Sequence, residues 1–316
     1  MNQLTKLVRT IDNFQRKHAS FGFLYAIIKK YSQDNCGYLS AVITYYGFLS
    51  LFPLLVVTTS LTKLLFNNNS SLKNRITSSI SHYFPIIGNQ LEHSIRSPRE
   101  SGVALIISLI IMIYGARGVA STLQYSLSLL WYVPQFKMPS FINNLARSLS
   151  IMVVGGFGLL AASIVSGFTV ISSHAVILKI LTTLGSLLIL WLTFIFIFKF
   201  SIGGKKRIKQ VIVGSAISAI GLVILQTLGG LIMVHELKGL SSVYGTFALV
   251  VGLLFWIYLQ AEVILYAVEV DVIRNYHLFP RSLQGSPTDS DKLAYLKQAG
   301  ISRQKTNEKL AIKFTK

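Results

Sequence analysis

The chain has 316 residues, of which 52% are hydrophobic and 13% are charged, and its mean hydropathy is +0.57. Water-soluble domains usually carry about 25% charged residues, so this composition excludes an ordinary soluble enzyme and indicates an integral membrane protein. The 30 lysine and arginine residues against 11 acidic residues give a formal net charge of +19, which favours an anionic neighbour, either lipid or nucleic acid. The single cysteine, Cys36, excludes an intrachain disulfide and a multi-cysteine zinc site.

Residues 1–37 are predicted to form a cytoplasmic amphipathic segment. Basic residues lie between apolar ones that recur at helical spacing, namely Leu4, Leu7, Val8, Ile11 and Phe14. This pattern is typical of a helix that lies on the inner leaflet of a membrane.

Six stretches are long enough and apolar enough to cross a bilayer as helices, since a hydrocarbon core of about 30 Å needs roughly 20 apolar residues. They are residues 38–66, 102–123, 144–171, 176–200, 208–234 and 243–268. The sequence therefore predicts an all-α, polytopic integral membrane protein with six transmembrane helices, in a membrane domain that covers residues 38–280.

The distribution of lysine and arginine predicts the orientation. These residues gather before the first span, around the second and fourth loops, and after the sixth span. Because positively charged loops resist translocation, both ends are expected in the cytoplasm. The expected partners are membrane lipids with anionic headgroups at the inner leaflet, and not nucleic acid, because no aromatic-rich soluble module accompanies the basic runs.

Two polar segments lie outside the predicted spans. Residues 67–101 are expected to form an outer loop with short surface helices that break near Pro85. Residues 281–316 have few apolar residues and many lysines, and we expect a basic, flexible cytoplasmic tail.

Arg117 is the most informative polar residue, because an ionisable group at membrane depth is costly and therefore a functional candidate. At about 1.5 Å per residue, it lies roughly 22 Å along the span that begins at Gly102. Ser121, Gln124 and Ser128 follow at helical spacing, so Arg117 is predicted to head a polar stripe on one helix face.

The sixth span carries Glu262 and Glu269, one heptad apart, and Arg147 begins the third span at a similar depth. Our hypothesis is that Arg117 and Arg147 face the two glutamates across a polar cavity that is open to the cytoplasm. The alternative is a structural ion pair that holds two helices together near the interface, since long side chains near helix ends also reach the headgroup region.

The first span adds Tyr46, Ser50 and Pro53 on one face. A proline kink there would line a cavity, although prolines are also tolerated in membrane helices for packing reasons alone. In the third span Gly158, together with the small residues that follow it on the same face, favours close helix packing. Such faces permit a homo-oligomer without requiring one.

No catalytic or cofactor signature is present in the sequence. Residues 203–206 do not form a P-loop, the six histidines never fall at metal-ligand spacing with a carboxylate, and no nucleophile elbow occurs. We therefore expect no metal, no cofactor and no enzymatic activity.

Three segments resemble the YihY/BrkB family of bacterial inner-membrane proteins, formerly labelled ribonuclease BN-like. They are AVITYYGFLSLFPLL at 41–55, YGARG at 114–118, and the sixth span over 243–270. The resemblance covers roughly residues 20–280 and implies a six-helix protein of the bacterial inner membrane. By matching positions, it implies that the motif residues here are Pro53, Arg117, Gly118, Tyr244, Gly245 and Glu269. Glu262 is a departure from the family pattern.

The resemblance and the polar residues together favour a transporter or flippase of a lipid or another anionic amphiphile, with some relatives linked to virulence. In this hypothesis Arg117 and Arg147 hold an anionic headgroup, and Glu262 or Glu269 releases it by competing ion pairing or protonation. Gln124 and Tyr46 would line the same pocket. The alternatives are a non-transporting membrane scaffold or envelope-maintenance protein and, from the family label alone, a ribonuclease.

Overall fold

The computed structural model describes residues 10, 12–65, 102–134, 140–171, 176–203, 207–236, 242–283 and 287–303. All regular structure in these ranges is helical, which confirms the predicted all-α class. A long apolar run can satisfy its backbone N–H and C=O groups in lipid only within its own helix. The helices therefore follow the apolar stretches of the sequence closely.

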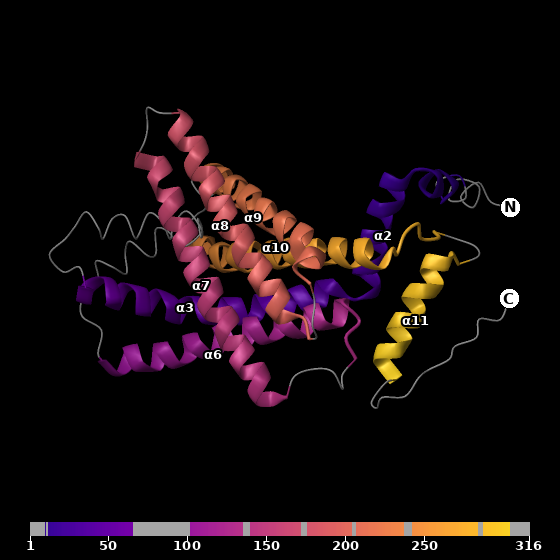
Figure 1. Ribbon diagram of the computed structural model, residues 1–316. Helices are drawn as coiled ribbons and strands as arrows, with labels where there is room; N and C mark the ends of the chain where they lie inside the picture. The colour runs from indigo at the N-terminus through magenta and orange to yellow at the C-terminus, as the bar shows by residue number, and fades with distance from the viewer. Residues whose placement is uncertain are drawn as a thin grey trace.

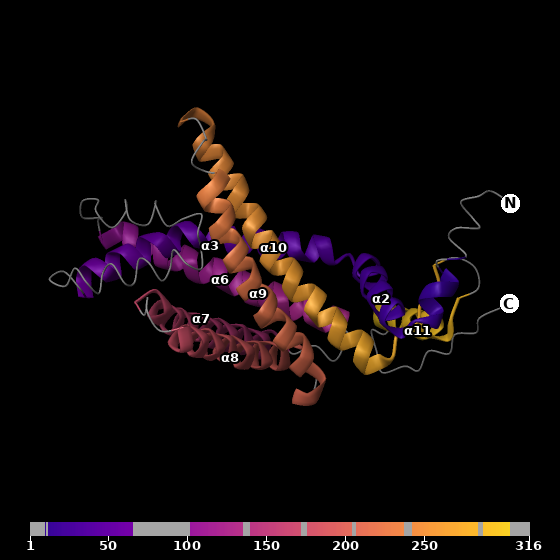
Figure 2. The same ribbon diagram turned by 90° about the horizontal axis from the view of Figure 1, so that it is seen from above.

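Six long helices form three pairs of chain neighbours that lie side by side (Figures 1 and 2). The first pair is α3 (Cys36–Leu65) with α6 (Gly102–Leu130), the second is α7 (Phe141–Ile171) with α8 (Val176–Ser201), and the third is α9 (Ile208–Glu236) with α10 (Ser242–Tyr276). The α7–α8 pair crosses α3 and α6 obliquely in Figure 1, and the α9–α10 pair crosses them obliquely in Figure 2. The core lies where these pairs meet.

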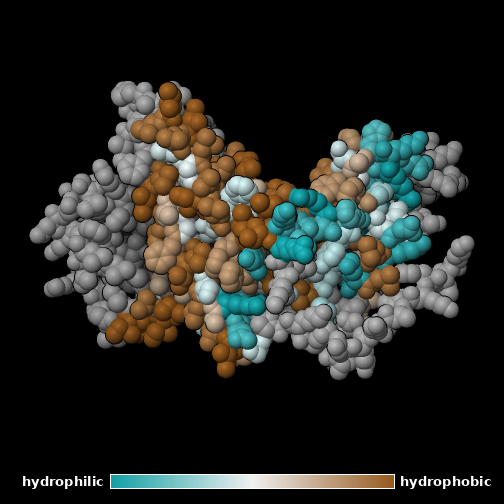
Figure 3. Space-filling model, viewed as in Figure 1, coloured by the Kyte–Doolittle hydropathy of each residue, from teal (hydrophilic) through white to brown (hydrophobic). Residues whose placement is uncertain are grey.

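Five of these helices are long and apolar enough to cross a membrane: Ile106–Leu130, Phe141–Ser166, Ile180–Ser201, Ile208–Gly229 and Val250–Tyr276. The sixth, α3, is apolar over the shorter stretch Cys36–Leu51, beyond which its side chains are outside the described part. Six crossings are therefore compatible with the structure. Brown, apolar side chains cover much of the visible surface of the bundle in Figure 3, as a lipid-facing surface requires.

Glycines allow two of the helix pairs to approach closely. A Cβ atom at Gly118 of α6 would overlap the ring of Tyr46 on α3. A Cβ atom at Gly214 of α9 would overlap the carboxylate of Asp271 on α10. The Gly214 N–H donates to Asp271 Oδ1 at 2.8 Å, and Asn275 Nδ2 donates to the Gln210 carbonyl at 2.8 Å, so α10 holds the start of α9 by its backbone.

Two shorter helices lie together at the end of the bundle where α3 begins and α10 ends (Figure 1). These are α2 (Ala19–Gln33), which follows a helical stretch over 12–17, and α11 (Asp289–Arg303). Asn35, with φ of 53°, separates α2 from α3, and asparagine tolerates this left-handed conformation better than most residues.

The C-terminal segment differs from the expected flexible tail in its described part. Residues 289–303 form α11, which Asp291 ties to α2 through an ion pair with Lys29 at 2.9 Å. Composition did not predict this helix, because ion pairs of Asp291 hold it and its buried apolar residue in the core is the small Ala294. The expected outer loop over 67–101 and the tail beyond 303 lie outside the described residues.

Candidate functional site

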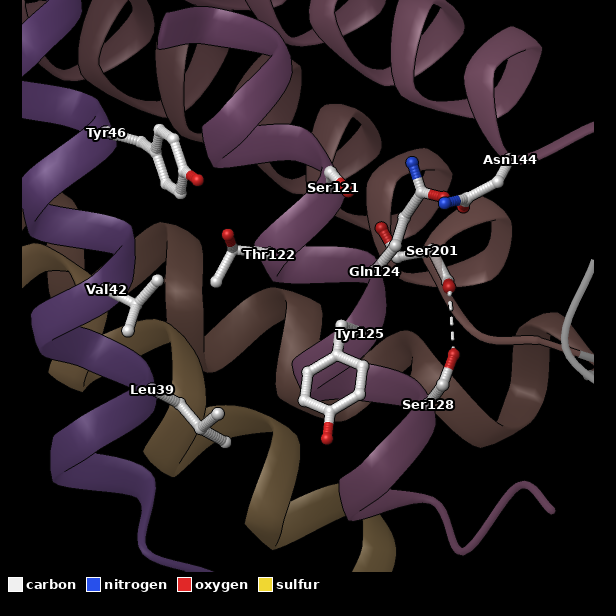
Figure 4. A pocket seen from close by; sticks show the side chains of 10 residues that line it. All are labelled: Leu39, Val42, Tyr46, Ser121, Thr122, Gln124, Tyr125, Ser128, Asn144 and Ser201. Carbon is white, nitrogen blue, oxygen red and sulfur yellow. Dashed lines mark hydrogen bonds between the residues drawn. The ribbon is translucent and has the colours of Figure 1, made fainter. Parts of the chain in front are cut away.

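A polar cavity of about 470 Å³ lies between α3, α6, the start of α7 and the end of α8 (Figure 4). This end of the bundle is the one that the charge distribution predicts to be cytoplasmic. Polar side chains of α6 recur along the cavity at helical spacing, and Tyr46 of α3 lies opposite them. The α6 residues that line it are Ser121, Thr122, Gln124, Tyr125 and Ser128.

Two of these side chains are already fixed by neighbouring helices. Gln124 Nε2 donates to Ser148 Oγ on α7 at 2.8 Å, and Ser128 Oγ accepts from the Gly203 N–H, just after α8, at 3.0 Å. These bonds attach α6 to α7 and to the segment that follows α8. The remaining hydroxyl and amide groups of the lining are thereby held around the cavity.

Arg117 lies deeper along the same helix, beside a second polar cavity of about 150 Å³. The two cavities share Tyr46, Ser121 and Thr122 in their linings, so they adjoin each other. Arg117, Ser121, Gln124 and Ser128 of α6 thus line the two adjoining cavities, and Tyr46 of α3 lines both of them.

The guanidinium of Arg117 has no carboxylate partner among the described residues. Its Nε atom is buried without a hydrogen-bond partner there, and the ring of Phe141 lies 5.9 Å from its central carbon. Arg117 as a whole is half-buried, and a cation with no counter-charge is costly in a bilayer. The cavity beside it is therefore suited to an anionic group.

The hypothesis that Arg117 or Arg147 pairs with Glu269 is wrong. Glu269 is fully buried and forms its ion pair with Lys30 of α2, at 2.7 Å between Nζ and Oε2. Lys30 Nζ also pairs with Asp34 and donates to the Leu130 carbonyl at 3.2 Å. Lys30 was not predicted as this partner, because it lies among the basic residues of the N-terminal segment, whose charge the predicted topology already explains.

The other predicted residues also lie apart from the cavity. Glu262 is near the hydroxyls of Tyr31 and Tyr258, and its Oε1 atom is buried with no hydrogen-bond partner in the described part of the chain. Arg147 is half-buried on α7 and lines neither polar cavity. The arrangement therefore brings Arg117, Gln124 and Tyr46 together, and separates them from the two glutamates.

The motif residues suggested by resemblance have mixed outcomes. Gly118 provides the close contact between α6 and Tyr46 described above. Pro53 lies within α3, and Tyr244 and Gly245 lie in the first turn of α10, but the surroundings of these three residues are outside the described part.

A second polar cluster, which sequence reasoning also missed, joins α2 to the segment after α10. Asp291 forms an ion pair with Arg281 at 2.9 Å and accepts hydrogen bonds from the N–H and hydroxyl of Ser282. Burial by itself raises the pKa of Asp291, but these bonds, with those from Thr288 and Lys29, hold the pKa well below its usual range. Asp291 is therefore charged at neutral pH and holds α11 in place.

The chain matches one known family. The model of the virulence factor BrkB family matches residues 27–291, from within α2 into α11, and so includes all six long helices. No curated protein and no solved structure matches the chain. The apolar helices and this match together indicate a multi-pass membrane protein. Because the match covers most of the chain, the protein belongs to the virulence factor BrkB family, as the resemblance predicted.

Proposed function

We propose that this protein is a bacterial inner-membrane transporter or flippase that binds the headgroup of an anionic amphiphile, such as a lipid, at Arg117. The observation that carries the proposal is the uncompensated guanidinium of Arg117 beside a polar cavity in a membrane-spanning helix. Arginine binds carboxylate and phosphate well because its planar group donates several hydrogen bonds at once. The proposal contains no enzymatic step and needs no nucleic acid.

The surroundings of Arg117 also suit a headgroup. The two adjoining cavities offer hydroxyl and amide groups from the predicted cytoplasmic end of α6 up to Arg117. An amphiphile that leaves the inner leaflet would meet neutral hydrogen-bonding groups first and the cation last. Basic residues near the inner leaflet would raise the local concentration of anionic lipids.

Release of the headgroup cannot use Glu269 in the way the sequence suggested, because Lys30 already occupies its carboxylate. Opening of the contact between α3 and α6 is a more direct route. Tyr46 lines both polar cavities and packs on Gly118, so a small separation of these two helices would change the shape of both cavities together.

The test is lipid movement in vesicles that contain the purified full-length protein. Fluorescent phosphatidylglycerol and phosphatidylcholine report the movement of an anionic and a zwitterionic lipid through their accessibility to dithionite. We expect faster movement of the anionic lipid, and a loss of about tenfold or more in Arg117→Gln, since a hydrogen bond to a charged group contributes about 1.5–3 kcal/mol.

Arg207→Gln is the matched control, because Arg207 is exposed before the start of α9 and lies outside both polar cavities. Circular dichroism and gel filtration confirm that both variants are folded. Equal lipid movement in the two variants would contradict the role of Arg117.

A membrane scaffold is the second candidate, and one observation favours it. The helical segment before α3 has a row of exposed apolar side chains, Phe14, Phe21, Leu24 and Ile28, on the arm that extends beyond the bundle. A scaffold would give no headgroup-selective lipid movement in the same vesicles, whereas a transporter would give it without any added partner.

A further inference from the structure

A separate, apolar cavity of about 360 Å³ lies in the middle of the bundle, and all six long helices contribute to its lining. None of the described residues that line it is charged, and most of them are aliphatic. Binding sites for small ligands have volumes of about 300–1,000 Å³ and are mainly apolar, so this cavity is in the range of a ligand site.

Two of the three polar side chains in the lining have a hydrogen-bond partner within their own helix. Ser50 Oγ donates to the Gly47 carbonyl at 2.8 Å, and Thr193 Oγ1 donates to the Ile189 carbonyl at 2.8 Å, so both hydroxyls are satisfied within their own helices. Gln260 has the remaining polar side chain in the lining. The lining is therefore mainly apolar, and cavities with apolar linings stay dry and bind apolar ligands.

The cavity extends to the outer surface of the bundle along α7. Gly156 and Leu159 line it and are exposed, with Leu159 41% exposed. A Cβ atom placed on Gly156 would meet no other atom within 4 Å, so there is open space at this position. A hydrocarbon chain in the surrounding bilayer therefore has a route into the cavity at α7.

The apolar cavity and the smaller polar cavity meet different faces of α6 at similar depth. Along α6, Ala116 and Val119 line the apolar cavity, whereas Arg117 and Gly118 line the polar one. Helix α6 thus has a polar face with Arg117 beside one cavity and an apolar face beside the other. An amphiphile needs both kinds of surface, a polar one for its headgroup and an apolar one for its hydrocarbon chain.

We infer that the central cavity binds an aliphatic chain of a membrane amphiphile. The statement that this chain and the headgroup at Arg117 belong to one ligand rests on the proposed function. The statement that the cavity binds an aliphatic chain does not depend on it. The chain enters beside Gly156 and lies between the three helix pairs. Aliphatic contacts hold it, and no ion pair is involved.

The test uses a fatty acid that carries a photoreactive diazirine near its methyl end, added to the purified full-length protein in detergent. After irradiation, mass spectrometry locates the labelled peptides. We expect labelling within 151–159 and 257–264, the stretches of α7 and α10 that line the cavity. Gly156→Phe fills the open space and is expected to reduce this labelling by about fivefold or more.

Val153→Phe is the matched control, since Val153 is exposed on the same helix and does not line the cavity. Its labelling is expected to equal that of the unaltered protein. If Gly156→Phe does not fold, Gly156→Leu and Ala116→Leu reduce the same space with smaller side chains. Labelling that is spread over the outer helix faces and is unchanged in all filling variants would overturn the inference.

A fatty alcohol with the same diazirine separates this inference from the proposed function. The uncharged probe should label the cavity in Arg117→Gln as strongly as in the unaltered protein, because chain binding needs no anion. Loss of lipid selectivity in Arg117→Gln with no effect of Gly156→Phe on labelling would support the headgroup site alone and refute the chain site. The opposite pattern would support the chain site and refute the headgroup role of Arg117.

Discussion

At the scale of residues, the buried ammonium of Lys30 contacts three separate helices or their ends in the described chain. Its ammonium pairs with Glu269 of α10 and with Asp34, and it donates to the carbonyl of Leu130 at the end of α6. Burial by itself lowers the pKa of Lys30, but the carboxylates of Glu269 and Asp34 hold it above its ordinary value. One cation therefore joins the N-terminal segment to two helices of the bundle.

Replacement of Lys30 should lower the free energy of unfolding more than replacement of Glu269. Glu269→Gln leaves Lys30 paired with Asp34, whereas Lys30→Met leaves two carboxylates close together without a cation. Loss of one partner of a buried pair costs about 3–5 kcal/mol, and we expect Lys30→Met to reach that range and Glu269→Gln to fall below it. Thermal unfolding in detergent measures the order.

The double variant Lys30→Met, Glu269→Leu provides the control, because it removes the buried charge of both partners. Its unfolding temperature should recover part of the loss seen in Lys30→Met. An unfolding temperature lower for Glu269→Gln than for Lys30→Met would contradict the proposed arrangement of charges.

At the scale of elements, α11 shows how polar contacts order a segment whose buried apolar residue in the core is the small Ala294. Asp291, in its first turn, receives hydrogen bonds from Ser282 and Thr288 and ion pairs from Lys29 and Arg281. Arg281 in turn donates to Gln33 Oε1 at 2.6 Å. These contacts connect α2, near the beginning of the described chain, to α11 at its end, and both helices lie outside the predicted spans.

The substitution Asp291→Asn should release α11 from α2, because the ion pairs lose their negative partner. Hydrogen exchange followed by mass spectrometry is expected to show faster exchange of the α11 amides at neutral pH. Asp289→Asn is the matched control, two positions earlier in the same helix, where the side chain is fully exposed and pairs only with Lys292 at 3.3 Å. Equal exchange in the two variants would show that Asp291 does not hold the helix.

The contribution of Asp291 to the stability of α11 depends on pH in a defined direction. The pKa of Asp291 in the folded state lies below its ordinary value of 3.8, so its contribution to stability is complete above that value and is lost as the pH falls below it. Acidification of the unaltered protein from pH 7 to pH 5 should therefore leave α11 protected from exchange.

At the scale of the whole molecule, the pairing of α2 with α11 has a topological consequence. These helices place the beginning and the end of the described chain at the same end of the bundle (Figure 1). Two chain ends lie on the same side of a membrane only if the chain crosses it an even number of times, and six predicted crossings satisfy this condition. The cytoplasmic location of both ends stays a prediction from the charge distribution.

Cysteine accessibility tests that orientation. In a Cys36→Ser background, Tyr295→Cys on α11 should react with a membrane-impermeant maleimide only after the inner membrane is opened, because Tyr295 is exposed and expected in the cytoplasm. Ser78→Cys, in the expected outer loop, should react without opening it. Reaction of Tyr295→Cys in sealed spheroplasts would reverse the predicted topology.

The amino-acid sequence by itself determined the local properties of this protein. Hydrophobic length defines a helix that spans a bilayer, so the six long helices and their approximate ends were predictable. Helical periodicity likewise placed Arg117, Ser121 and Gln124 on one face, and the structure has them around adjoining cavities. Both are properties of a single helix, which needs no partner to define them.

Only the tertiary structure decided which faces meet. The partner of Glu269 is Lys30 rather than Arg117, and the apolar cavity exists because three helix pairs cross at angles that leave space between them. Helical spacing gives the direction of a side chain around its own axis, but the neighbour it meets depends on crossing angles and close contacts such as Gly118 with Tyr46. Those depend on the packing of the whole bundle, which no single stretch of sequence contains.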